Sequence, residues 1–373
     1  MIASVSKTVV WTALSMVYDA GLFKIDDSID KVMPFKVRNP GHKSVPLTYR
    51  MLYAHTNGIK DEYGGYLFDT KCPANKPYTK SLATVILRHT KKKSNWYKFK
   101  PGETHKYTNY GTALAALLVE RHTGMEFTYF VQNYIFNPLA MKSSKFYRPR
   151  DGSASEQYSF NGGKNTYHTW SGGYCFPDYP SGQLWTTSAD LAKFSRVMLN
   201  HGRLSSSPTR CLYSAKTGTQ VFKKTAPGKG DGDSAMGWFV GKPYYPGGAG
   251  HDGSEGGVTT ELFLHLDSPR IAIGWLANGE LSYKEGKQMT QKMMAVAKSM
   301  GSGPAPPNDS CIKIWKGRNE SCQDSEIFKF KKDKSCAWVA SSLGRITKFC
   351  NKKVKDKLIK EWCPLACTNC LVE

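Results

Sequence analysis

The chain has 373 residues, of which 40% are hydrophobic and 22% are charged, so it is too long for one small module and too apolar for a disordered protein. Its 52 Lys and Arg residues exceed its 30 Asp and Glu residues by 22, and this excess favours anionic partners without naming one. No apolar run approaches the roughly 18 residues that a membrane-spanning helix needs.

Helical patterns and strand-like runs alternate over residues 1–300. Apolar residues recur at helical spacing in 6–20 and again in 111–123, and a glycine that can end a helix follows each segment. A further helix is expected from Ser188, whose hydroxyl can cap the segment DLAKFSRVMLNH before the helix ends at Gly202. These three segments form the predicted helical part of the core.

The end of this region is expected to form a hairpin of two strands followed by a helix. Residues 260–266 and 270–278 are strand-like, and the Asp-Ser-Pro sequence between them is typical of a turn. Residues 284–300 return to helical spacing. Mixed strands and helices over this length predict an α+β (α/β) fold with one antiparallel sheet.

Ten cysteines are placed unevenly along the chain. Four are scattered and their pairing is left open: Cys72, Cys175, Cys211 and Cys311. The other six crowd the C-terminal stretch: Cys322, Cys336, Cys350, Cys363, Cys367 and Cys370. A segment this short cannot bury enough apolar surface to hold itself together, so the set is typical of a disulfide framework in a secreted protein. An extracellular location is therefore expected, although MIASVSK is not a signal peptide.

Ser4 and Lys7 form an S-x-x-K motif at the start of the first predicted helix. Residues three apart share one helical face, with Cβ atoms about 5 to 6 Å apart, so the amine can reach the hydroxyl. A lysine whose ammonium is disfavoured by burial can take the serine proton, and the helix N-terminus favours a developing oxyanion. The motif alone is common, so an ordinary helix start with a solvated lysine stays open at this point.

Three further segments follow the motif in a set order. They are LTYRMLYAHTNGI (47–59), PGETHKYTNYGTALAALLVERHTG (101–124) and GHDGSEGGVTTELFLHLD (250–267). With the S-x-x-K motif, they resemble the serine hydrolases related to class C β-lactamases and penicillin-binding proteins. Tyr107-Thr-Asn109 matches the family's Tyr-x-Asn element, and His251-Asp-Gly253 matches the His-x-Gly variant of its Lys-Thr-Gly element. The resemblance covers residues 1–300 and implies an antiparallel sheet flanked by helices, with a helical subdomain.

The resemblance also implies roles for the residues that handle protons. Ser4 would be the acylated nucleophile, with Lys7 and Tyr107 as the proton-handling pair. A phenol beside an ammonium is expected to shift toward phenolate, which would make Tyr107 a base. Asn109 would orient Lys7 and the substrate. His55, in a turn that resembles the family's His-Thr-Ser-Gly, is interpreted as structural.

The remaining implied roles concern substrate binding. His251 would bind a carboxylate or polarise the leaving group, and Gly253 would let the substrate backbone approach. The backbone N–H groups of Ser4 and Ser254 would form the oxyanion hole. No cofactor and no metal site are expected, because no His or Cys pair before the C-terminal stretch has ligand spacing.

The chain begins three residues before Ser4, whereas members of this family normally carry a helix and two strands before S-x-x-K. We therefore interpret the sequence as N-terminally truncated, with any signal peptide lost. The sheet is expected to be open at an edge beside the His251 strand, with the core partly uncovered, and the activity of the truncated chain is in question.

The C-terminal stretch follows a segment, GSGPAPPNDS, that is a linker by composition. The spacing C-x3-C-x2-C at its end resembles the ShK-type toxin (ShKT) fold. That resemblance implies a linker over 301–321 and an ShKT domain over 322–370. It also implies the pairs Cys322–Cys370, Cys336–Cys363 and Cys350–Cys367, although six cysteines alone leave 15 pairings open. A zinc site fits this spacing poorly.

A basic loop in this stretch carries Lys352, Lys353, Lys355 and Lys357. It is expected to bind an anionic glycan or surface. Block of a potassium channel fits less well, because Lys355 is followed by Asp356 rather than an aromatic residue. A solvated lysine face with no partner is an equal alternative.

Two functions follow from these patterns. The first is a secreted serine hydrolase that acts on an ester, amide or peptide through an acyl-enzyme. The second is a catalytically inert binding or venom-type protein whose C-terminal module is active. No nucleic-acid-binding motif is found.

Overall fold

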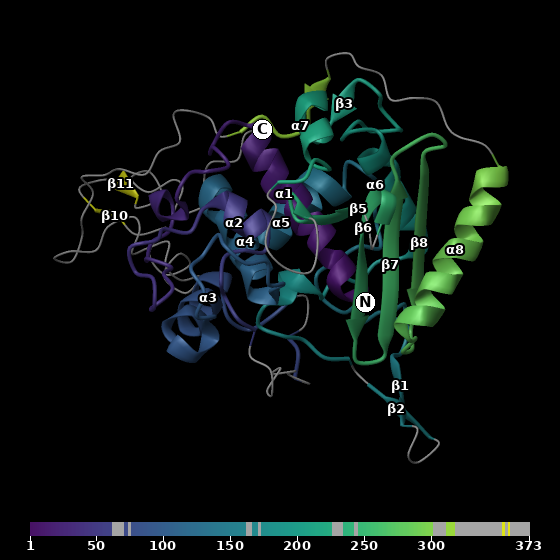
Figure 1. The fold of residues 1–373 in the computed structure, drawn as a ribbon, viewed down its shortest axis with the longest axis horizontal. Coiled ribbons are helices and arrows are strands. Elements are labelled where there is room, and N and C mark those ends of the chain that lie inside the picture. The colour runs from purple at the N-terminus through teal and green to yellow at the C-terminus, as the bar shows by residue number, and fades with distance from the viewer. Residues whose placement is uncertain are drawn as a thin grey trace.

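The structure is a computed structural model, shown in Figure 1. It describes residues 1–61, 71–73, 76–161, 166–170, 173–225, 234–241, 245–300 and 311–317, and the backbone of two short strands, β10 (Lys353–Val354) and β11 (Lys357–Leu358). A mainly helical part lies beside an antiparallel sheet, with its outer face covered by one long helix (Figure 1). The α+β architecture predicted for residues 1–300 is confirmed.

Five antiparallel strands form the main sheet in the order β4-β5-β6-β7-β8. Their bounds are β4 Ser234–Ala235, β5 Trp238–Gly241, β6 Tyr245–Glu255, β7 Val258–His265 and β8 Ile271–Ala277. The hairpin predicted from 260–266 and 270–278 is confirmed as β7 and β8. Within the described ranges no strand pairs with the outer side of β8. The open edge was expected beside the His251 strand, but that strand, β6, pairs with both β5 and β7.

The two faces of the sheet bury different partners. Phe263 and Trp275 face α8 (Tyr283–Ser299), which packs over this side with Met294. Leu262 and Leu264 point the other way, into the main core. The predicted final helix is confirmed as α8 and begins with a capping box formed by Ser282 and Glu285. The alternation of period two therefore places the main core on the inner face.

The main core surrounds two buried helices, α1 (Lys7–Asp19) and α4 (Asn109–Thr123), which pack against each other. Both predicted helices are confirmed, and α4 ends at Gly124, whose φ of 75° is left-handed. The helix predicted from Ser188 is α6 (Ser188–Leu199). Its cap is Thr187 rather than Ser188, because Thr187 is extended and its side chain accepts a hydrogen bond from the Asp190 N–H.

Shorter elements connect these parts. The helical ones are η1 (Ala3–Ser6), η2 (Ile29–Lys31), α2 (Tyr49–Tyr53), α3 (Leu82–Lys91), η3 (Lys93–Asn95), α5 (Phe127–Val131), η4 (Gln132–Phe136), η5 (Tyr179–Ser181) and α7 (Ala215–Gln220). The strands are β1 (Tyr158–Asn161), β2 (Thr166–Thr169), β3 (Arg210–Cys211) and β9 (Ile312–Lys313). None of the described helices has the length and apolar content to cross a membrane.

Two disulfides join the four scattered cysteines whose pairing the sequence left open. Cys72 pairs with Cys175, and Cys211 pairs with Cys311. No cysteine in the described part of the chain is free. The six C-terminal cysteines, and hence their implied ShKT pairing, lie outside the described residues, as do the side chains of the basic loop.

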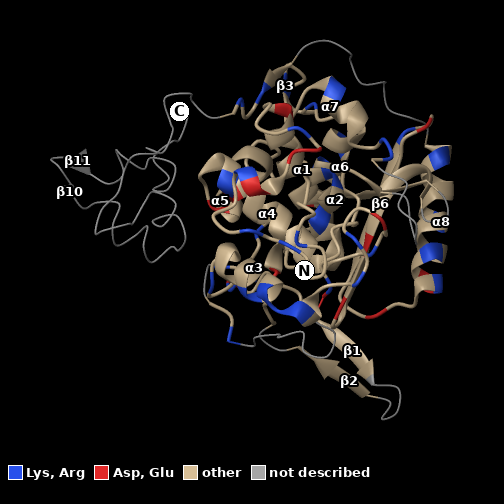
Figure 2. Cartoon of the chain, turned by 60° about the vertical axis from the view of Figure 1, so that its left-hand side comes forward, with Lys and Arg blue, Asp and Glu red and all other residues tan. Residues whose placement is uncertain are grey.

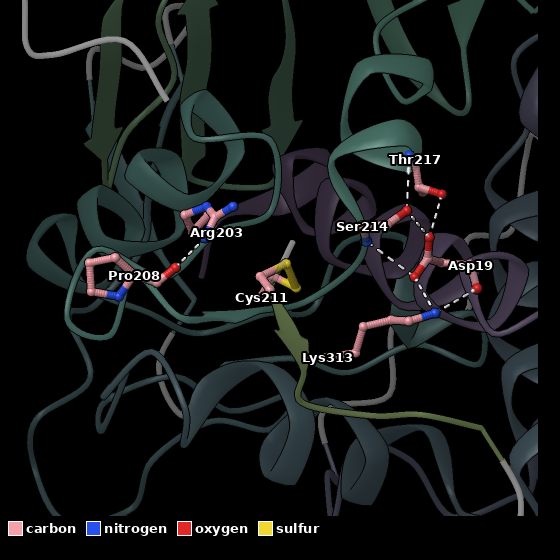
Figure 3. Close-up of a disulfide and its surroundings, with 8 residues drawn as sticks. Asp19, Arg203, Pro208, Cys211, Ser214, Thr217 and Lys313 are labelled. Atoms are coloured by element: carbon pink, nitrogen blue, oxygen red, sulfur yellow. Dashed lines mark hydrogen bonds and ion pairs between the residues drawn. A yellow bond between two sulfur atoms is a disulfide. The ribbon is translucent and has the colours of Figure 1, made fainter. Parts of the chain in front are cut away.

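Residues 311–317 are bound to the body of the protein (Figure 3). Strand β9 pairs with β3 beside the Cys211–Cys311 bond. Lys313 Nζ lies 3.0 Å from a carboxylate oxygen of Asp19 at the end of α1, and Trp315 is buried against Phe130. The range predicted as a linker, 301–321, therefore contains a short docked segment, which we call the strap.

Charged groups are spread over the surface (Figure 2). Lys and Arg residues lie on α3, α7 and α8, on different sides of the molecule. Over the described residues the positive excess is therefore not gathered on one face.

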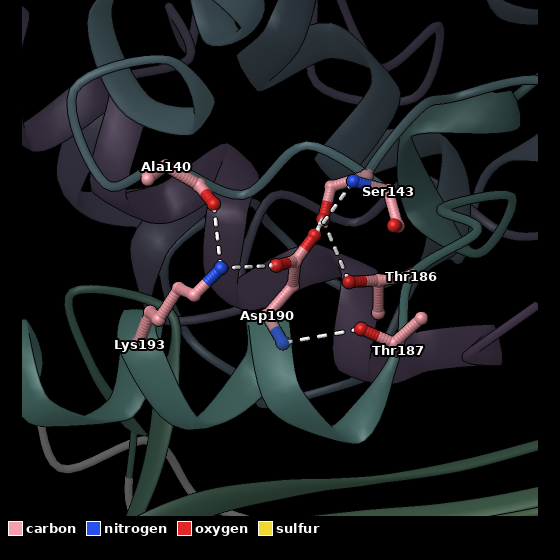
Figure 4. Close-up of polar contacts among 7 residues, drawn as sticks. Ala140, Ser143, Thr186, Thr187, Asp190 and Lys193 are labelled. Atoms are coloured by element: carbon pink, nitrogen blue, oxygen red, sulfur yellow. Dashed lines mark hydrogen bonds and ion pairs between the residues drawn. The ribbon is translucent and has the colours of Figure 1, made fainter.

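One buried acid joins α6 to the distant loop that carries Ser143 and Ser144 (Figure 4). Asp190 accepts hydrogen bonds from the Ser143 N–H at 2.8 Å and the Ser144 hydroxyl at 3.1 Å, and it pairs with Lys193 at 2.8 Å. Asp190 is only 3% exposed, whereas the Ser144 hydroxyl also contacts the Thr186 hydroxyl and Lys193 also donates to the Ala140 carbonyl.

Replacing Asp190 with Ala is expected to lower the free energy of unfolding by about 2 kcal/mol, since it removes the acceptor of the Ser143 N–H group and a buried contact of the Ser144 hydroxyl. Urea unfolding followed by circular dichroism measures the change. The exposed Asp151 offers a control, and D151A should change stability little. Equal midpoints for D190A and the unchanged chain would contradict the interpretation.

Candidate active site

The Ser4 and Lys7 side chains meet as the motif predicts. Ser4 lies in η1, which runs directly into α1, and Lys7 is the first residue of that helix. Lys7 Nζ lies 3.0 Å from Ser4 Oγ and donates a second hydrogen bond to the Ser181 carbonyl at 2.6 Å. Lys7 is completely buried, so the alternative of a solvated lysine does not hold.

Burial changes the proton affinity of the lysine. It lowers the pKa of Lys7 to about 8, an effect that the carboxylates of Asp178, Asp61, Glu255 and Asp252 oppose in that order. A substantial fraction of the amine is therefore neutral at slightly alkaline pH. A neutral amine at hydrogen-bond distance from a serine hydroxyl can accept its proton.

Tyr107 lies beside this pair with its ring under the lysine. Lys7 Nζ is 4.9 Å from the centre of the Tyr107 ring. The expected shift toward phenolate is wrong: burial raises the pKa of Tyr107 well above its usual value, and the nearby Ser4 side chain opposes this only in part. Desolvation of the anion outweighs the lysine. Tyr107 is thus a neutral phenol that can donate a proton.

His251 is neutral as well. Burial lowers the pKa of His251 to about 4, although Asp252 opposes the change. Its Nδ1 lies 2.6 Å from the Asp252 carbonyl oxygen, which requires the proton on Nδ1 and leaves Nε2 as an acceptor. Nε2 is buried with no partner among the described residues, and the ring centre is 5.9 Å from that of Tyr107. A neutral imidazole does not attract a carboxylate by charge. The prediction that His251 binds a substrate carboxylate is therefore not supported.

Gly253 lies where β6 passes the nucleophile. A Cβ built on Gly253 would come within 3.0 Å of the Ser4 nitrogen and 2.8 Å of the Ile2 carbonyl oxygen. Because Gly253 has no side chain, the strand can pass close to Ser4. The glycine was expected to let the substrate backbone approach, and the structure shows that Ser4 itself already needs this space. Thr260, opposite Gly253 on β7, donates a hydrogen bond to the Ile2 carbonyl at 2.8 Å.

The neighbouring residue Ser254 has its side chain exposed, on the opposite side of β6 from Gly253. Its predicted contribution is the backbone N–H group, and that role, like the matching role of the Ser4 N–H, stays a prediction.

A buried acid that the sequence did not single out holds the start of α4. Asp61 accepts hydrogen bonds from the Thr108 hydroxyl at 2.9 Å and from the backbone N–H groups of Asn109 and Tyr110 at 2.9 and 3.2 Å. This fixes the turn that carries Tyr107. The predicted role of Asn109 in orienting Lys7 stays a prediction.

His55 has the structural role that was expected. It is buried with a φ of 50°, and its Nδ1 accepts a hydrogen bond from the Thr108 N–H at 3.4 Å. Its ring centre lies 4.9 Å from that of Tyr107. His55 therefore packs beside the Tyr107 ring and holds the turn before α4.

Two further carboxylates near Lys7 were missed. Asp178 is buried and accepts a hydrogen bond from the Ser181 hydroxyl at 2.8 Å, so it holds the turn whose carbonyl binds Lys7. Glu255 is the last residue of β6. The only sequence signal was position: Asp178 precedes the SGQLWTTSADLAKF segment, and Glu255 lies two residues after the His-x-Gly element. No group of His, Cys, Asp and Glu side chains within the described ranges is arranged to hold a metal ion.

Comparisons with known proteins agree with this arrangement. Residues 1–298 match the family model described as Beta-lactamase. Penicillin-binding protein 4* of Bacillus subtilis is 22% identical over 298 residues, which cover 75% of this chain and 60% of that protein. The D-alanyl-D-alanine-carboxypeptidase/endopeptidase AmpH of Escherichia coli is 24% identical over 273 residues, covering 70% of this chain and 66% of AmpH. The chain thus spans about three fifths to two thirds of these two relatives.

Solved structures show the same fold. The D-amino acid amidase of Ochrobactrum anthropi, complexed with L-phenylalanine amide, has a TM-score of 0.60 at 20% identity, and the match covers 80% of this chain and 84% of the amidase. A penicillin-binding protein from Bacillus halodurans has a TM-score of 0.60 at 18% identity, with the same coverage of both chains.

Proposed function

Because the chain belongs to the β-lactamase family, we propose that it is a serine hydrolase that cleaves an ester, amide or peptide bond through an acyl-enzyme on Ser4. The observation that carries this proposal is the contact of 3.0 Å between the Lys7 amine and the Ser4 hydroxyl, in a place where burial lowers the pKa of Lys7 to about 8. A serine needs such a base to act as a nucleophile near neutral pH.

The chemical steps follow from the protonation states. The neutral Lys7 amine takes the proton as Ser4 Oγ attacks the substrate carbonyl carbon. The oxyanion that forms is bound by the backbone N–H groups of Ser4 and Ser254. Tyr107, a neutral phenol beside Lys7, donates a proton to the leaving group and is reprotonated from the Lys7 ammonium. Water then hydrolyses the ester on Ser4 by the reverse path.

The neutral state of His251 supports a role in orientation. Its free Nε2 can accept a hydrogen bond from the Tyr107 hydroxyl or from a substrate N–H. The names of the relatives describe a carboxypeptidase/endopeptidase and an amidase, so small molecules or peptides with an amide bond are the first substrates to test.

Labelling with a fluorophosphonate tests the proposal. The full chain should form one covalent adduct, which mass spectrometry places on Ser4, and Ser4→Ala should form none. Ser206→Ala, at an exposed serine, is the matched control and should label normally. A folded chain that is not labelled, or an S4A variant labelled as well as its parent, would leave the alternative of an inert binding protein.

The proposal includes secretion and a separate C-terminal module. The two disulfides support an oxidising environment. The ShKT fold over 322–370, its three disulfides and the binding of an anionic glycan by the basic loop remain predictions from the sequence, and mass-spectrometric mapping of the disulfides tests the fold.

A further inference from the structure

A groove lies on the outer face of the main sheet, between β6, β7 and α8. Its volume is about 520 Å³, which is within the range of pockets that hold small molecules. The β7 residues that line it alternate with Thr260, whose side chain reaches Ile2 beside Ser4. The groove is therefore separate from the candidate active site and lies on the opposite face of the sheet.

Two glycines of β6 make room for the floor of this groove. Gly250 pairs with Phe263 of β7 and shares its outward face, as does Gly248 two residues earlier. A Cβ built on Gly250 would come within 2.5 Å of the Tyr245 ring, and one on Gly248 within 2.7 Å of the Phe263 ring. The centres of the two rings are 5.4 Å apart. The rings occupy the space over the glycines and, with Met294 of α8, form an apolar floor.

The acid that lines the groove is bonded within the protein. Glu261 is 4% exposed and accepts a hydrogen bond from the Thr290 hydroxyl through one carboxylate oxygen. Its other oxygen lies 3.8 Å from Lys287 Nζ. Thr290 in turn accepts a hydrogen bond from Trp275 Nε1 at 2.8 Å. Because both oxygens of Glu261 already face protein groups, the groove offers this acid to no cationic ligand.

The other charged side chains of the groove are basic. Lys287 and Lys298 lie on the same side of α8, about 16 Å apart along the helix axis. Lys287 Nζ is held over the Tyr245 ring, 5.0 Å from its centre, and near Glu261. The Lys298 side chain is exposed and forms no hydrogen bond or ion pair with any residue that the structure describes. An acidic group at that end of the groove would therefore meet a cation without a partner.

We propose that this groove binds a small amphipathic anion, with its apolar body on the aromatic floor and its carboxylate or sulfonate group at Lys298. Charge complementarity selects this chemistry, because Lys298 is unpaired whereas Glu261 is already bonded. Tyr245 and Phe263 supply the apolar contact. The inference goes beyond the proposed hydrolysis and does not depend on it, since no groove residue contacts Ser4 or Lys7.

The test compares two fluorescent probes that share their aromatic rings, the anionic anilinonaphthalene sulfonate and the neutral phenylnaphthylamine. Each should bind the full chain at one saturable site, with the sulfonate more tightly bound. Lys298→Glu should weaken binding of the sulfonate about threefold to tenfold, the effect of reversing one exposed charge contact. It should leave binding of the neutral probe unchanged. Ala295→Trp places an indole in the groove and should remove the site for both probes.

Two neighbouring positions on α8 give matched controls. Val296 is 63% exposed and does not line the groove, so V296W should bind both probes as its parent does. Lys292→Glu makes the same charge change outside the groove and should leave the sulfonate affinity unchanged at about 0.15 M salt, where distant charges are screened. Circular dichroism checks that A295W is folded.

Three results would overturn the proposal. The first is that neither probe binds the full chain at a saturable site. The second is a folded A295W chain that keeps the site. The third is that K298E weakens both probes equally or leaves both unchanged.

Discussion

Replacing Lys7 with Met is expected to slow fluorophosphonate labelling of Ser4 by a factor of about 10² to 10⁴, the usual contribution of a general base. Met has a similar length and no proton affinity, so it removes the base without leaving a large cavity. Lys7→Arg should be slow as well, because a guanidinium keeps the charge but does not give up its proton near neutral pH. The two variants separate proton transfer from charge alone.

The dependence of the labelling rate on pH shows which group acts as the base. In the unchanged chain the labelling rate should rise with pH and level off above about pH 8, because burial lowers the pKa of Lys7 to about 8 and only the neutral amine accepts a proton. In Tyr107→Phe the same inflection should remain, since the phenol is neutral throughout this range. An inflection that disappears in Tyr107→Phe and persists in Lys7→Met would make the phenol the base.

Loss of folding must be told apart from loss of chemistry. Lys7 is buried among carboxylates, so replacing it with Met leaves buried negative charge without its cation and is expected to lower the stability of the fold. Thermal unfolding of both Lys7 variants should remain cooperative, with a lower midpoint for K7M. A K7M chain that melts cooperatively and is labelled at the parental rate would contradict the assignment of Lys7.

The sequence predicted the Ser4–Lys7 contact because that contact is local. Two residues three apart at the start of a helix meet without help from the rest of the chain. Tyr107 and His251 came from the family resemblance, since nothing in their own neighbourhood specifies that they approach each other. The structure brings their rings together through α4 and β6.

The protonation states could not be predicted, because they depend on burial by distant segments. Tyr107 was expected to be a phenolate beside an ammonium, but desolvation dominates once the ring is covered. Asp61 and Asp178 hold the turns around Lys7, and neither belongs to a motif. Their contacts to residues 108–110 and to Ser181 form only when the chain folds.

The docking of the strap is a second feature that could not be predicted from the sequence. Composition marks 301–310 as a linker and the ShKT resemblance implied that the linker continues to 321, but Trp315 lies in a buried aromatic contact. The pairing of Cys311 with a residue 100 positions earlier is not encoded by local spacing. The hairpin β7–β8 was predictable, in contrast, because its turn and both strands are contiguous.

Replacing both Cys211 and Cys311 with Ser is expected to lower the free energy of unfolding by about 4 kcal/mol, the loop-entropy value for a closure of this length. The bond spans 100 residues, and it also holds the strap on the body. The Cys72–Cys175 bond spans 103 residues, so chain entropy alone predicts the same loss for that pair. Urea unfolding without reductant compares the two double variants.

A larger loss for the Cys211 and Cys311 pair would measure the docking of the strap. Trp315→Ala, with both disulfides intact, should then cost about 3 kcal/mol by itself, because it empties a buried aromatic site against Phe130. If the strap is docked only because the disulfide holds it there, W315A should cost little and the two double variants should lose equally. Unequal losses together with a costly W315A would instead make residues 311–317 an integral part of the folded domain rather than a linker.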